Sequence, residues 1–380
     1  MSTLIYPIRE LSTPAPRIPW RVFDRPFLLL WGYLLVVALA EVLTALVSAE
    51  LGMTLHALLL VGLTIRGASW QLGAERRLAM ALTMAPLTRL ISLAMPLTNL
   101  PQMAWYPIVS APLLIAAWLI IRQLRVSRAE LGLRRGNLPL QLMLMGCGLG
   151  LGFVEYIILA PPPLTTEFSW STLALSAALL AVSTGFTEEL IFRGLLQSVA
   201  TPTLGRWALV YVSLLFAALH IGYLSFLDIV FVFGVGLLFA HIVRWSGSIL
   251  GVSLAHGATN VTLFLIMPYL ARYPTGAVAA IAPWVIWGGI AITIVAVHIL
   301  ILRASLAQPA ARTASLTPTN IRVLRRDAGL TYADLAARSG VPARTIAEIE
   351  HGLCSPRPEY LLQIAEGLGV TPQSLIPIAA

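Results

Sequence analysis

The sequence has 380 residues, of which 58% are hydrophobic and 11% are charged, and its mean hydropathy is +0.84. These values exclude an ordinary soluble protein and predict a polytopic membrane protein. The net charge of +8 comes from arginine alone because the chain has no lysine, and its two cysteines are too few and too far apart for a disulfide framework or a thiolate metal site.

The first 26 residues form a polar, proline-rich tail, and an apolar run of about 20 residues follows it. That run is too long for a signal-peptide core and lacks a small-residue cleavage site, so we expect it to be a retained first span. Further apolar runs predict an all-α bundle of about ten spans. Their approximate bounds are 27–47, 52–66, 78–97, 104–121, 138–160, 171–192, 207–223, 226–243, 248–268 and 278–302.

The arginines predict the orientation of these spans. If the N-terminus is cytoplasmic, nearly all arginines fall in inner loops or in the C-terminal tail, as positively charged loops prefer. The exceptions are Arg89 inside a span and Arg272 in an outer loop. We therefore expect a multi-pass protein of the cell membrane with both termini in the cytoplasm.

Changes of composition divide the chain. An N-terminal bundle at 27–121 is followed by an arginine-rich connector at 122–137 and by a second membrane domain at 138–302. The connector needs no role beyond setting topology. Residues 303–318 have the Ala, Ser, Thr and Pro content of a linker, and 319–380 have the composition of a small soluble domain.

The fifth span carries two unusual features. Glycines recur at every second position from Gly146 to Gly152, which predicts close packing of helices rather than a site. Glu155 is an intramembrane carboxylate for which the sequence offers no partner.

Two adjacent carboxylates and an arginine lie in the apolar segment 183–197. An unpaired charge in a membrane span costs at least ~2.5 kcal/mol. Glu189 and Arg193 are four residues apart and can pair on one helix face, whereas Glu188 points about 100° away. A structural ion pair explains Glu189 and Arg193 but leaves Glu188 unexplained, which favours a functional role.

Three polar residues in later spans can reach the same depth. With an inner turn near Leu204, Glu188 and His220 each lie roughly 24 Å along their helices. The next inner turn places Asn260 at roughly 21 Å and His256 at roughly 15 Å. We therefore expect these side chains to converge in the inner half of the bilayer.

Such a cluster can hydrolyse a bond. A carboxylate beside a neutral imidazole can take a proton from water, and an imidazole and an amide can stabilise the oxyanion of a tetrahedral intermediate. A lone histidine in an apolar span is more typical of a hydrogen-bonded core residue. We interpret His56, His241 and His298 in that way.

Three segments that contain these polar residues resemble the motifs of a known protein family. E-E-L-I-F-R-G at 188–194, F-A-A-L-H at 216–220 and H-G-A-T-N at 256–260 are similar, in order and spacing, to the three motifs of the CAAX prenyl protease and bacteriocin-processing family of intramembrane proteases. The resemblance covers roughly 130–302. It extends to A-E-L-G-L-R-R-G at 129–136 and R-W-S-G-S-I at 244–249, and the chain departs from it at Gly251, where proline is common.

The resemblance implies roles for the residues of these motifs. Glu188 and His220 would activate the attacking water, and His256 with Asn260 would form the oxyanion side. The implied catalytic set is Glu188, Glu189, Arg193, His220, His256 and Asn260.

The family is often described as metalloproteases, and two mechanisms fit the residues. A divalent metal such as zinc, with three protein ligands and an open position for water, is chemically acceptable. Its candidate ligands are Glu188, His220 and His256. The same residues serve a metal-free mechanism in which a glutamate activates water, and no H-E-x-x-H motif occurs.

The segment 319–380 shows closely spaced helix signals. Helices are expected to stop at Gly329, Gly340, Gly352 and Gly369 and to start at Thr331, Pro342 and Thr371. L-T-Y-A-D-L-A-A-R-S-G-V followed by P-A-R-T-I-A-E-I-E-H-G resembles the phage-repressor (Cro-like) helix-turn-helix family. This implies a soluble five-helix domain with Leu335, Ile346 and Ile349 in its core.

The resemblance implies DNA recognition through the second helix of the motif. Arg344 would pair with guanine, and Glu348 would accept from cytosine. Acidic residues balance the arginines of the domain, however, so the basic footprint of a DNA-binding protein is missing. The alternative is a protein-binding or homodimerisation module. The expected base-reading positions are Ala343, Arg344, Thr345 and Glu348.

We expect an intramembrane endopeptidase that cleaves a membrane-associated, prenylated or leader-bearing protein, with membrane lipid and DNA as further partners. The rival interpretation is a non-catalytic membrane sensor or scaffold whose tail regulates transcription or binds protein. A scaffold has no need to keep several costly polar residues at one depth, which favours the enzyme. A transporter is less consistent because the spans show no paired half-repeat.

Overall fold

The structure is a computed structural model, and it describes residues 25–68, 74–165, 169–205, 207–313, 320–350 and 358–375. Contacts divide the chain into two compact units, Met1–Val297 and His298–Ala380. The expected N-terminal tail up to residue 24 and the part 314–318 of the expected linker lie outside the described residues.

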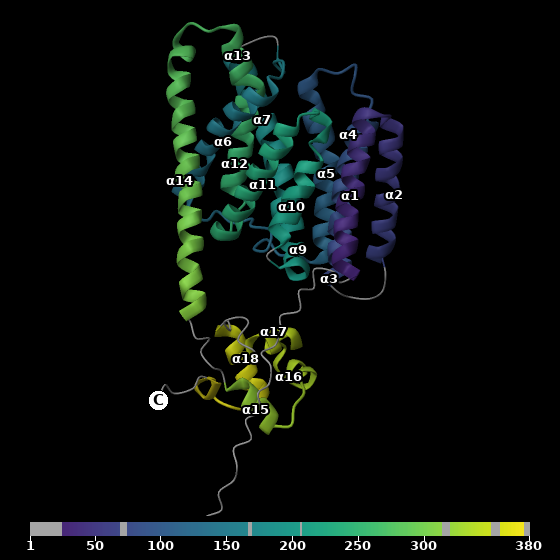
Figure 1. The fold of residues 1–380 in the computed structure, drawn as a ribbon, viewed down its shortest axis with the longest axis vertical. Coiled ribbons are helices and arrows are strands. Elements are labelled where there is room, and N and C mark those ends of the chain that lie inside the picture. Colours follow the sequence, from purple (N-terminus) through teal and green to yellow (C-terminus); the bar gives the residue numbers. More distant parts are fainter. Residues whose placement is uncertain are drawn as a thin grey trace, which may run out of the picture. The chain divides into compact units, whose positions relative to one another are not determined.

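The first unit is a bundle of membrane helices (Figure 1). In the described part of the chain, nine helical segments are long and apolar enough to cross a membrane, and a shorter apolar one runs at Trp207–Tyr223. The expected all-α, multi-pass class is confirmed. Each expected span has a counterpart, but the seventh is too short to count as a full crossing because its helix ends at Ala218.

The third expected span is interrupted in the structure. The expected third span is split in two at Thr83, and its second half ends at Ala94, before Pro96. The helices are α1 (Arg25–Leu46), α2 (Ala49–Ala68), α3 (Ala74–Leu82), α4 (Met84–Ala94) and α5 (Gln102–Leu124).

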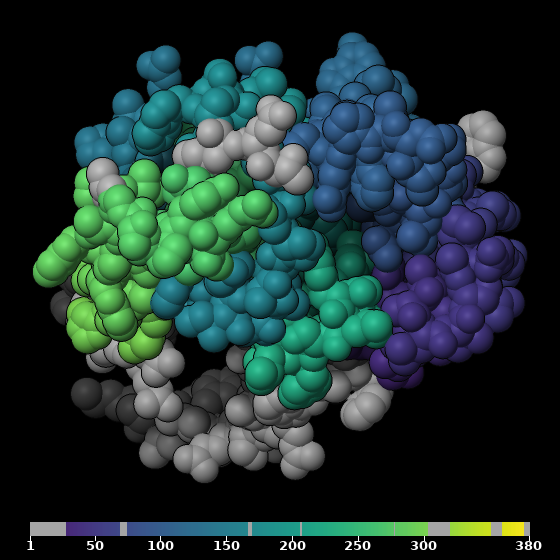
Figure 2. Space-filling model, turned by 90° about the horizontal axis from the view of Figure 1, so that it is seen from above, coloured from purple at the N-terminus to yellow at the C-terminus, as the bar shows by residue number. Residues whose placement is uncertain are grey.

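The second half of the unit contains three π-helical segments, η2, η3 and η5, set into longer helices. Viewed from above, the N-terminal helices in purple and blue occupy one side of the bundle, and the later helices in teal and green occupy the other (Figure 2). The elements are α6 (Leu138–Leu159), α7 (Trp170–Leu180), η2 (Ala181–Phe186), α8 (Thr187–Glu189), η3 (Leu190–Leu196), α9 (Gln197–Leu204), α10 (Trp207–Ala218), η4 (Ile221–Tyr223), α11 (Phe226–Ser246), α12 (Leu250–Val261), η5 (Thr262–Ile266), α13 (Met267–Arg272) and α14 (Ala277–Thr313).

One buried core joins the two halves of this unit. Leu82 of α3 and Leu113 of α5 belong to the same apolar cluster as Leu195 of η3 and Phe216 of α10. The Tyr211 hydroxyl also donates to the Leu30 carbonyl at 3.1 Å, which ties α10 to α1. The N-terminal helices are therefore packed against the helices that carry the polar motifs.

The connector folds against the turn before α12. Asn137 caps α6 by accepting from the Leu140 amide at 3.0 Å. The Ile249 amide donates to the Gly132 carbonyl at 3.0 Å, and the Ser248 hydroxyl donates to the Arg134 carbonyl at 2.6 Å. The two flanking motifs of the sequence thus meet and fix where α12 begins.

Gly251, near the start of α12, forms a backbone hydrogen bond to α6. Its amide donates to the Gln141 side-chain oxygen at 2.7 Å, a bond that proline could not form. The start of α12 is therefore held from α6 through the amide of this glycine.

Beyond the end of α14, the described residues of the second unit form four α-helices and a final 3-10 turn, where a five-helix domain was expected. Thr331 forms a capping box with Asp334 at the start of α16 (Tyr332–Ser339), and Gly340 ends the same helix with φ +71. The expected core residues Leu335, Ile346 and Ile349 are buried. The elements are α15 (Ile321–Asp327), α16 (Tyr332–Ser339), α17 (Ala343–Glu350), α18 (Pro358–Leu368) and η6 (Pro372–Leu375).

The glycines of α6 pack as expected. A Cβ at Gly148 or Gly152 would collide with the carbonyls of Ala255 or Thr259 on α12, so these helices touch through backbone.

We predict that Gly148→Ala lowers the thermal stability of the detergent-solubilised protein, since overpacking costs about 1–3 kcal/mol. Gly234→Ala on α11, which has open space, is the control. Equal melting temperatures for the two variants would contradict this packing.

Candidate active site

The two adjacent glutamates lie at a break in helix geometry. Thr187–Glu189 form one short α-helical stretch between the π-helical segments η2 and η3. Such π-helical bulges often occur at functional sites because they change the direction in which side chains point. The motif is therefore set within an irregular helix, which the sequence periodicity did not predict.

Two glycines bring this helix against α12. A Cβ on Gly185 would lie 2.6 Å from the Ser253 carbonyl oxygen, and one on Gly257 would lie 2.9 Å from the Ala181 Cα. Only glycine permits so close an approach of two backbones. This contact brings His256, next to Gly257, to the glutamates.

Glu189 is the buried centre of a charge network. Its Oε1 accepts from Arg193 Nη1 at 3.0 Å and from His256 Nδ1 at 2.9 Å, and its side chain has no exposure. The pair of Glu189 and Arg193 therefore forms as their spacing predicted. The Arg193 guanidinium also lies over the Phe216 ring at 4.4 Å.

This network fixes the protons of His256. A carboxylate beside an arginine only accepts hydrogen bonds, so Nδ1 of His256 carries the proton that Glu189 receives. The other ring nitrogen, Nε2, lies 3.8 Å from Oε2 of Glu188. His256 thus bridges the two glutamates.

Glu188 faces a cavity rather than the network. Its side chain keeps 32% exposure, against none for Glu189. The cavity has a volume of about 140 Å³ and is lined by Glu188, His220, His256 and Asn260 among others. The structure thus brings together the residues that the sequence placed at one depth.

His220 lies where the helix α10 has ended. Its backbone, at φ −97 and ψ 0, is in the bridge region where active-site residues are often found. Its Nδ1 lies 2.9 Å from the Phe216 carbonyl, which can only accept, so Nε2 keeps a free lone pair. A neutral His220 therefore presents a base at the cavity.

Asn260 is oriented by a threonine that the sequence reasoning missed. Its Nδ2 donates to Thr184 Oγ1 at 2.7 Å, and that hydroxyl donates to the Leu180 carbonyl at 2.6 Å. An amide nitrogen carries two hydrogens, so one remains for a ligand in the cavity.

A second cavity of about 330 Å³ adjoins the first. Glu188, His220, Phe216 and Tyr223 line both, as do Tyr106 and Thr184. The helices α4 and α5 form its far wall. The N-terminal bundle therefore contributes to the site, which no motif indicated.

The arrangement does not form the zinc site considered from the sequence. Within the described residues, no group of three or more His, Cys, Asp or Glu side chains could hold a metal ion. His220 uses Nδ1 for a carbonyl and His256 uses Nδ1 for Glu189, and these contacts orient both rings. The ligand set of Glu188, His220 and His256 is not supported by this geometry.

The other histidines were only partly interpreted correctly. His56 is buried and hydrogen-bonded to Glu41 at 3.0 Å, as a core residue should be. His241 and His298 are exposed on their helices, so the core interpretation was wrong for both. His241 satisfies Nδ1 with its own helix, at the Leu237 carbonyl, and needs no core partner.

Glu155 has a place that its isolation in the sequence did not reveal. It is almost buried, at 8% exposure, and it lines the smaller cavity with Glu188. An intramembrane carboxylate is costly, and this signal alone marked it for attention.

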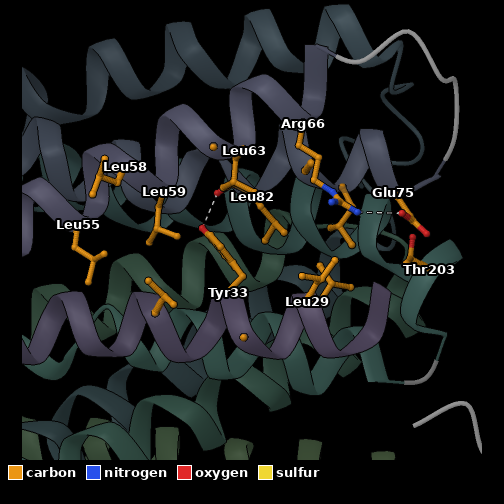
Figure 3. A pocket seen from close by; sticks show the side chains of 16 residues that line it. Leu29, Tyr33, Leu55, Leu58, Leu59, Leu63, Arg66, Glu75, Leu82 and Thr203 are labelled. Carbon is orange, nitrogen blue, oxygen red and sulfur yellow. Dashed lines mark hydrogen bonds and ion pairs between the residues drawn. The ribbon is translucent and has the colours of Figure 1, made fainter. Parts of the chain in front are cut away.

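A further cavity has a larger volume than the two cavities at Glu188. A cavity of about 430 Å³ lies among α1, α2 and α3 (Figure 3), with Arg66 and Glu75 paired at 3.3 Å near one end. Leucines such as Leu58 and Leu59 line the remainder. Its carboxylate, Glu75, is paired with Arg66 and no histidine among the described residues lines it, so it lacks the glutamate–histidine combination of the smaller cavity.

In the second unit, the expected base-reading positions lie on α17. Arg344 is exposed, and its Nε donates to Glu348 Oε1 at 2.9 Å, so these two side chains pair with each other. Ala343 and Thr345 are partly buried. The expected set therefore shares one short helix.

Tyr332 forms its contacts inside the domain. Its hydroxyl donates to Glu350 Oε2 at 3.0 Å, and the Arg325 guanidinium lies 4.1 Å from the centre of its ring. Arg325 also pairs with both carboxylate oxygens of Glu350, at 2.7 and 3.0 Å. Arg325 and Glu350, one arginine and one acid of this domain, therefore pair with each other inside it.

Comparisons with known proteins agree with both parts. Residues 170–262 match the family described as type II CAAX prenyl endopeptidase Rce1-like, and residues 319–376 match a helix-turn-helix domain. Neither comparison with curated proteins nor comparison with solved structures gave a match.

The geometry predicts that substitutions of the two glutamates differ in their effect on the stability of the protein. We predict that Glu189→Gln strongly destabilises the protein, by about 3–5 kcal/mol, because it leaves Arg193 buried without an anion. Glu188→Gln should leave stability near that of the wild type, since this side chain faces a cavity. Thermal unfolding in detergent measures both. Replacing both charges in Glu189→Leu/Arg193→Met should restore stability, and equal stability of the two single variants would contradict the assignment.

Proposed function

We propose that this chain, which joins an Rce1-like CAAX protease domain to a helix-turn-helix domain, hydrolyses a peptide bond of a membrane-associated substrate. The supporting observation is the shared cavity. Glu188, His220, His256 and Asn260 come from three separate helical segments and line one enclosed space. Convergence of costly polar groups in a membrane bundle is typical of a site that does chemistry.

Glu188 and His220 are proposed to activate water. A water molecule between them would be aligned by the lone pair on His220 Nε2 while the Glu188 carboxylate takes its proton. The hydroxide oxygen then bonds to the scissile carbonyl carbon. The proton on Glu188 passes to the leaving amine nitrogen as the carbon–nitrogen bond breaks.

The oxyanion of the intermediate is proposed to face Asn260 and His256. Asn260 keeps one N–H free of Thr184. His256 can donate from Nε2 only when both ring nitrogens are protonated, and the two carboxylates on either side of it favour that charged form. Glu189 and Arg193 act as positioning residues, since they orient His256.

We predict that Glu188→Gln and His220→Ala each reduce cleavage by about 10²- to 10⁴-fold, the usual contribution of acid–base groups. Membrane proteomes of cells that carry wild type or variant would be compared for a peptide end that disappears. His241→Ala, at an exposed histidine outside the site, is the matched control. Wild-type turnover in either site variant, with normal membrane insertion, would leave the sensor or scaffold interpretation in place.

The second unit is proposed to bind DNA through α17 on the cytoplasmic side, where the arginine distribution predicts that the C-terminus lies. Arg322, Arg326, Arg338 and Arg344 are exposed, while Arg325 and Glu350 are used internally. This gives the surface of the unit the arginines that phosphate contacts require. A homodimer through this unit is compatible with such binding, since helix-turn-helix dimers read paired half-sites.

We predict that the solubilised full-length protein selects a preferred duplex from random DNA. Arg344→Ala should weaken binding to that duplex by about 1–3 kcal/mol and relax one base position, since a bidentate base contact is lost. Arg322→Ala on α15 is the control and should weaken binding to all sequences alike if it contacts phosphate. Recovery of no preferred sequence would favour the protein-binding alternative.

A further inference from the structure

A second buried charge cluster lies in the N-terminal helices, outside the segment that matches the protease family. Glu41 of α1 and His56 of α2 have fully buried side chains. Oε1 of Glu41 accepts from Arg89 Nε at 2.6 Å and contacts His56 Nε2 at 3.0 Å. Three helices thus cooperate to hold one arginine in a fixed direction.

Arg89 is aimed at the site that contains Glu188. Its side chain keeps 19% exposure and lines the larger of the two cavities, the one with Glu188 and His220 in its wall. Its Nη2 also lies near the turn after His220, because a Cβ on Gly222 would be 3.7 Å from that nitrogen. The positive charge is therefore held near the proposed water-activating pair.

The pairing of Arg89 with Glu41 uses only Nε and leaves Nη1 and Nη2 available. Glu41 engages Nε, and in the described part of the chain no hydrogen bond from Nη1 or Nη2 is found. A pair that only neutralised charge would be expected to use the two-point geometry that arginine forms with carboxylates, as Arg325 does with Glu350. Here, among the described residues, the terminal nitrogens stay without a hydrogen bond on a residue that lines the larger cavity, and Nη2 lies near Gly222.

We propose that Arg89 is a specificity-determining residue that binds a carboxylate of the peptide substrate. This inference rests on the proposed function and deepens it. A guanidinium with its terminal N–H groups exposed in a low-dielectric cavity matches a carboxylate in shape and charge. The carboxylate is either the C-terminus of the substrate or an Asp or Glu side chain near the scissile bond.

The two cavities differ in charge in a way that would orient the substrate. Arg89 lines only the larger cavity, whereas Glu155 lines only the smaller one, and Glu188 lies between them in both walls. A peptide lying across Glu188 would have its anionic end on the side of Arg89. The opposite direction would bring its carboxylate to the cavity lined by Glu155, which Arg89 does not line.

The test uses the full-length protein in detergent and peptide pools that contain no Asp or Glu. One pool has free C-terminal carboxylates, a second has C-terminal amides, and a third has amides with a single Asp introduced. We expect the wild type to prefer a carboxylate-bearing pool over the plain amide pool by about tenfold or more in kcat/KM. Preference for the first pool assigns the C-terminus, and preference for the third assigns an acidic side chain.

Arg89→Gln should reduce that ratio toward one, mainly through KM, and Arg89→Lys should keep part of it. Because Arg89→Gln leaves Glu41 buried without its cation, Glu41→Gln/Arg89→Gln provides a second variant with no unpaired charge. Arg66→Gln, which removes an exposed arginine of α2, is the matched control and should keep the full ratio. An unchanged ratio in both Arg89 variants would overturn the proposal.

A binding arm separates this inference from the proposed function. The Glu188→Gln protein is incubated with the same pools, and the retained peptides are identified by mass spectrometry. Retention that favours carboxylates and is lost with Arg89→Gln supports the subsite even if the wild type cleaves nothing. Retention without such a preference, or no retention from any pool, overturns the Arg89 proposal, whereas loss of cleavage alone counts only against the protease.

Discussion

The hydrogen bonds from Arg193 and His256 to a single oxygen of Glu189 are the interaction on which the site depends. A charge in an apolar bundle is costly, and removing one partner of a buried ion pair leaves an uncompensated charge. Here the network is shared among η3, α8 and α12, so its cost also fixes how these segments meet. It leaves Glu188, the neighbouring residue, free to face the cavity.

The backbone supports this arrangement through close approach rather than through side chains. Gly185 and Gly257 let η2 and α12 touch, and Gly148 and Gly152 do the same for α6 and α12. The helix α12 is thus held on two sides by backbone contacts, and its entry is fixed by Gln141 and the connector. A rigid position for His256 follows, and catalytic geometry in proteins requires such support.

The site also extends beyond the segment that matches the protease family. Tyr106 and Arg89 come from helices of the N-terminal bundle, yet they line the cavity that contains Glu188 and His220. The shared core of the unit explains why, since α3 and α5 are packed against η3 and α10. In the proposed function, one part of the chain would supply the reactive groups, and the N-terminal bundle would help to select what reaches them.

The sequence by itself determined the helical membrane class and the C-terminal helix-turn-helix unit, and it predicted the candidate site residues Glu188, Glu189, Arg193, His220, His256 and Asn260. Apolar runs, helical spacing and the energetic cost of intramembrane charges are local properties, so they can be seen in one dimension. The pairing of Glu189 with Arg193 followed from the same kind of reasoning.

Only the tertiary structure decided which partners those residues have. Thr184 beneath Asn260, the bond from His256 to Glu189, and the contribution of Arg89 depend on contacts between segments far apart in the chain. The π-helical segments around Thr187–Glu189 likewise change side-chain directions that ideal periodicity would fix. Helix packing, and not the order of residues, sets these distances, because close approach depends on where two backbones can touch.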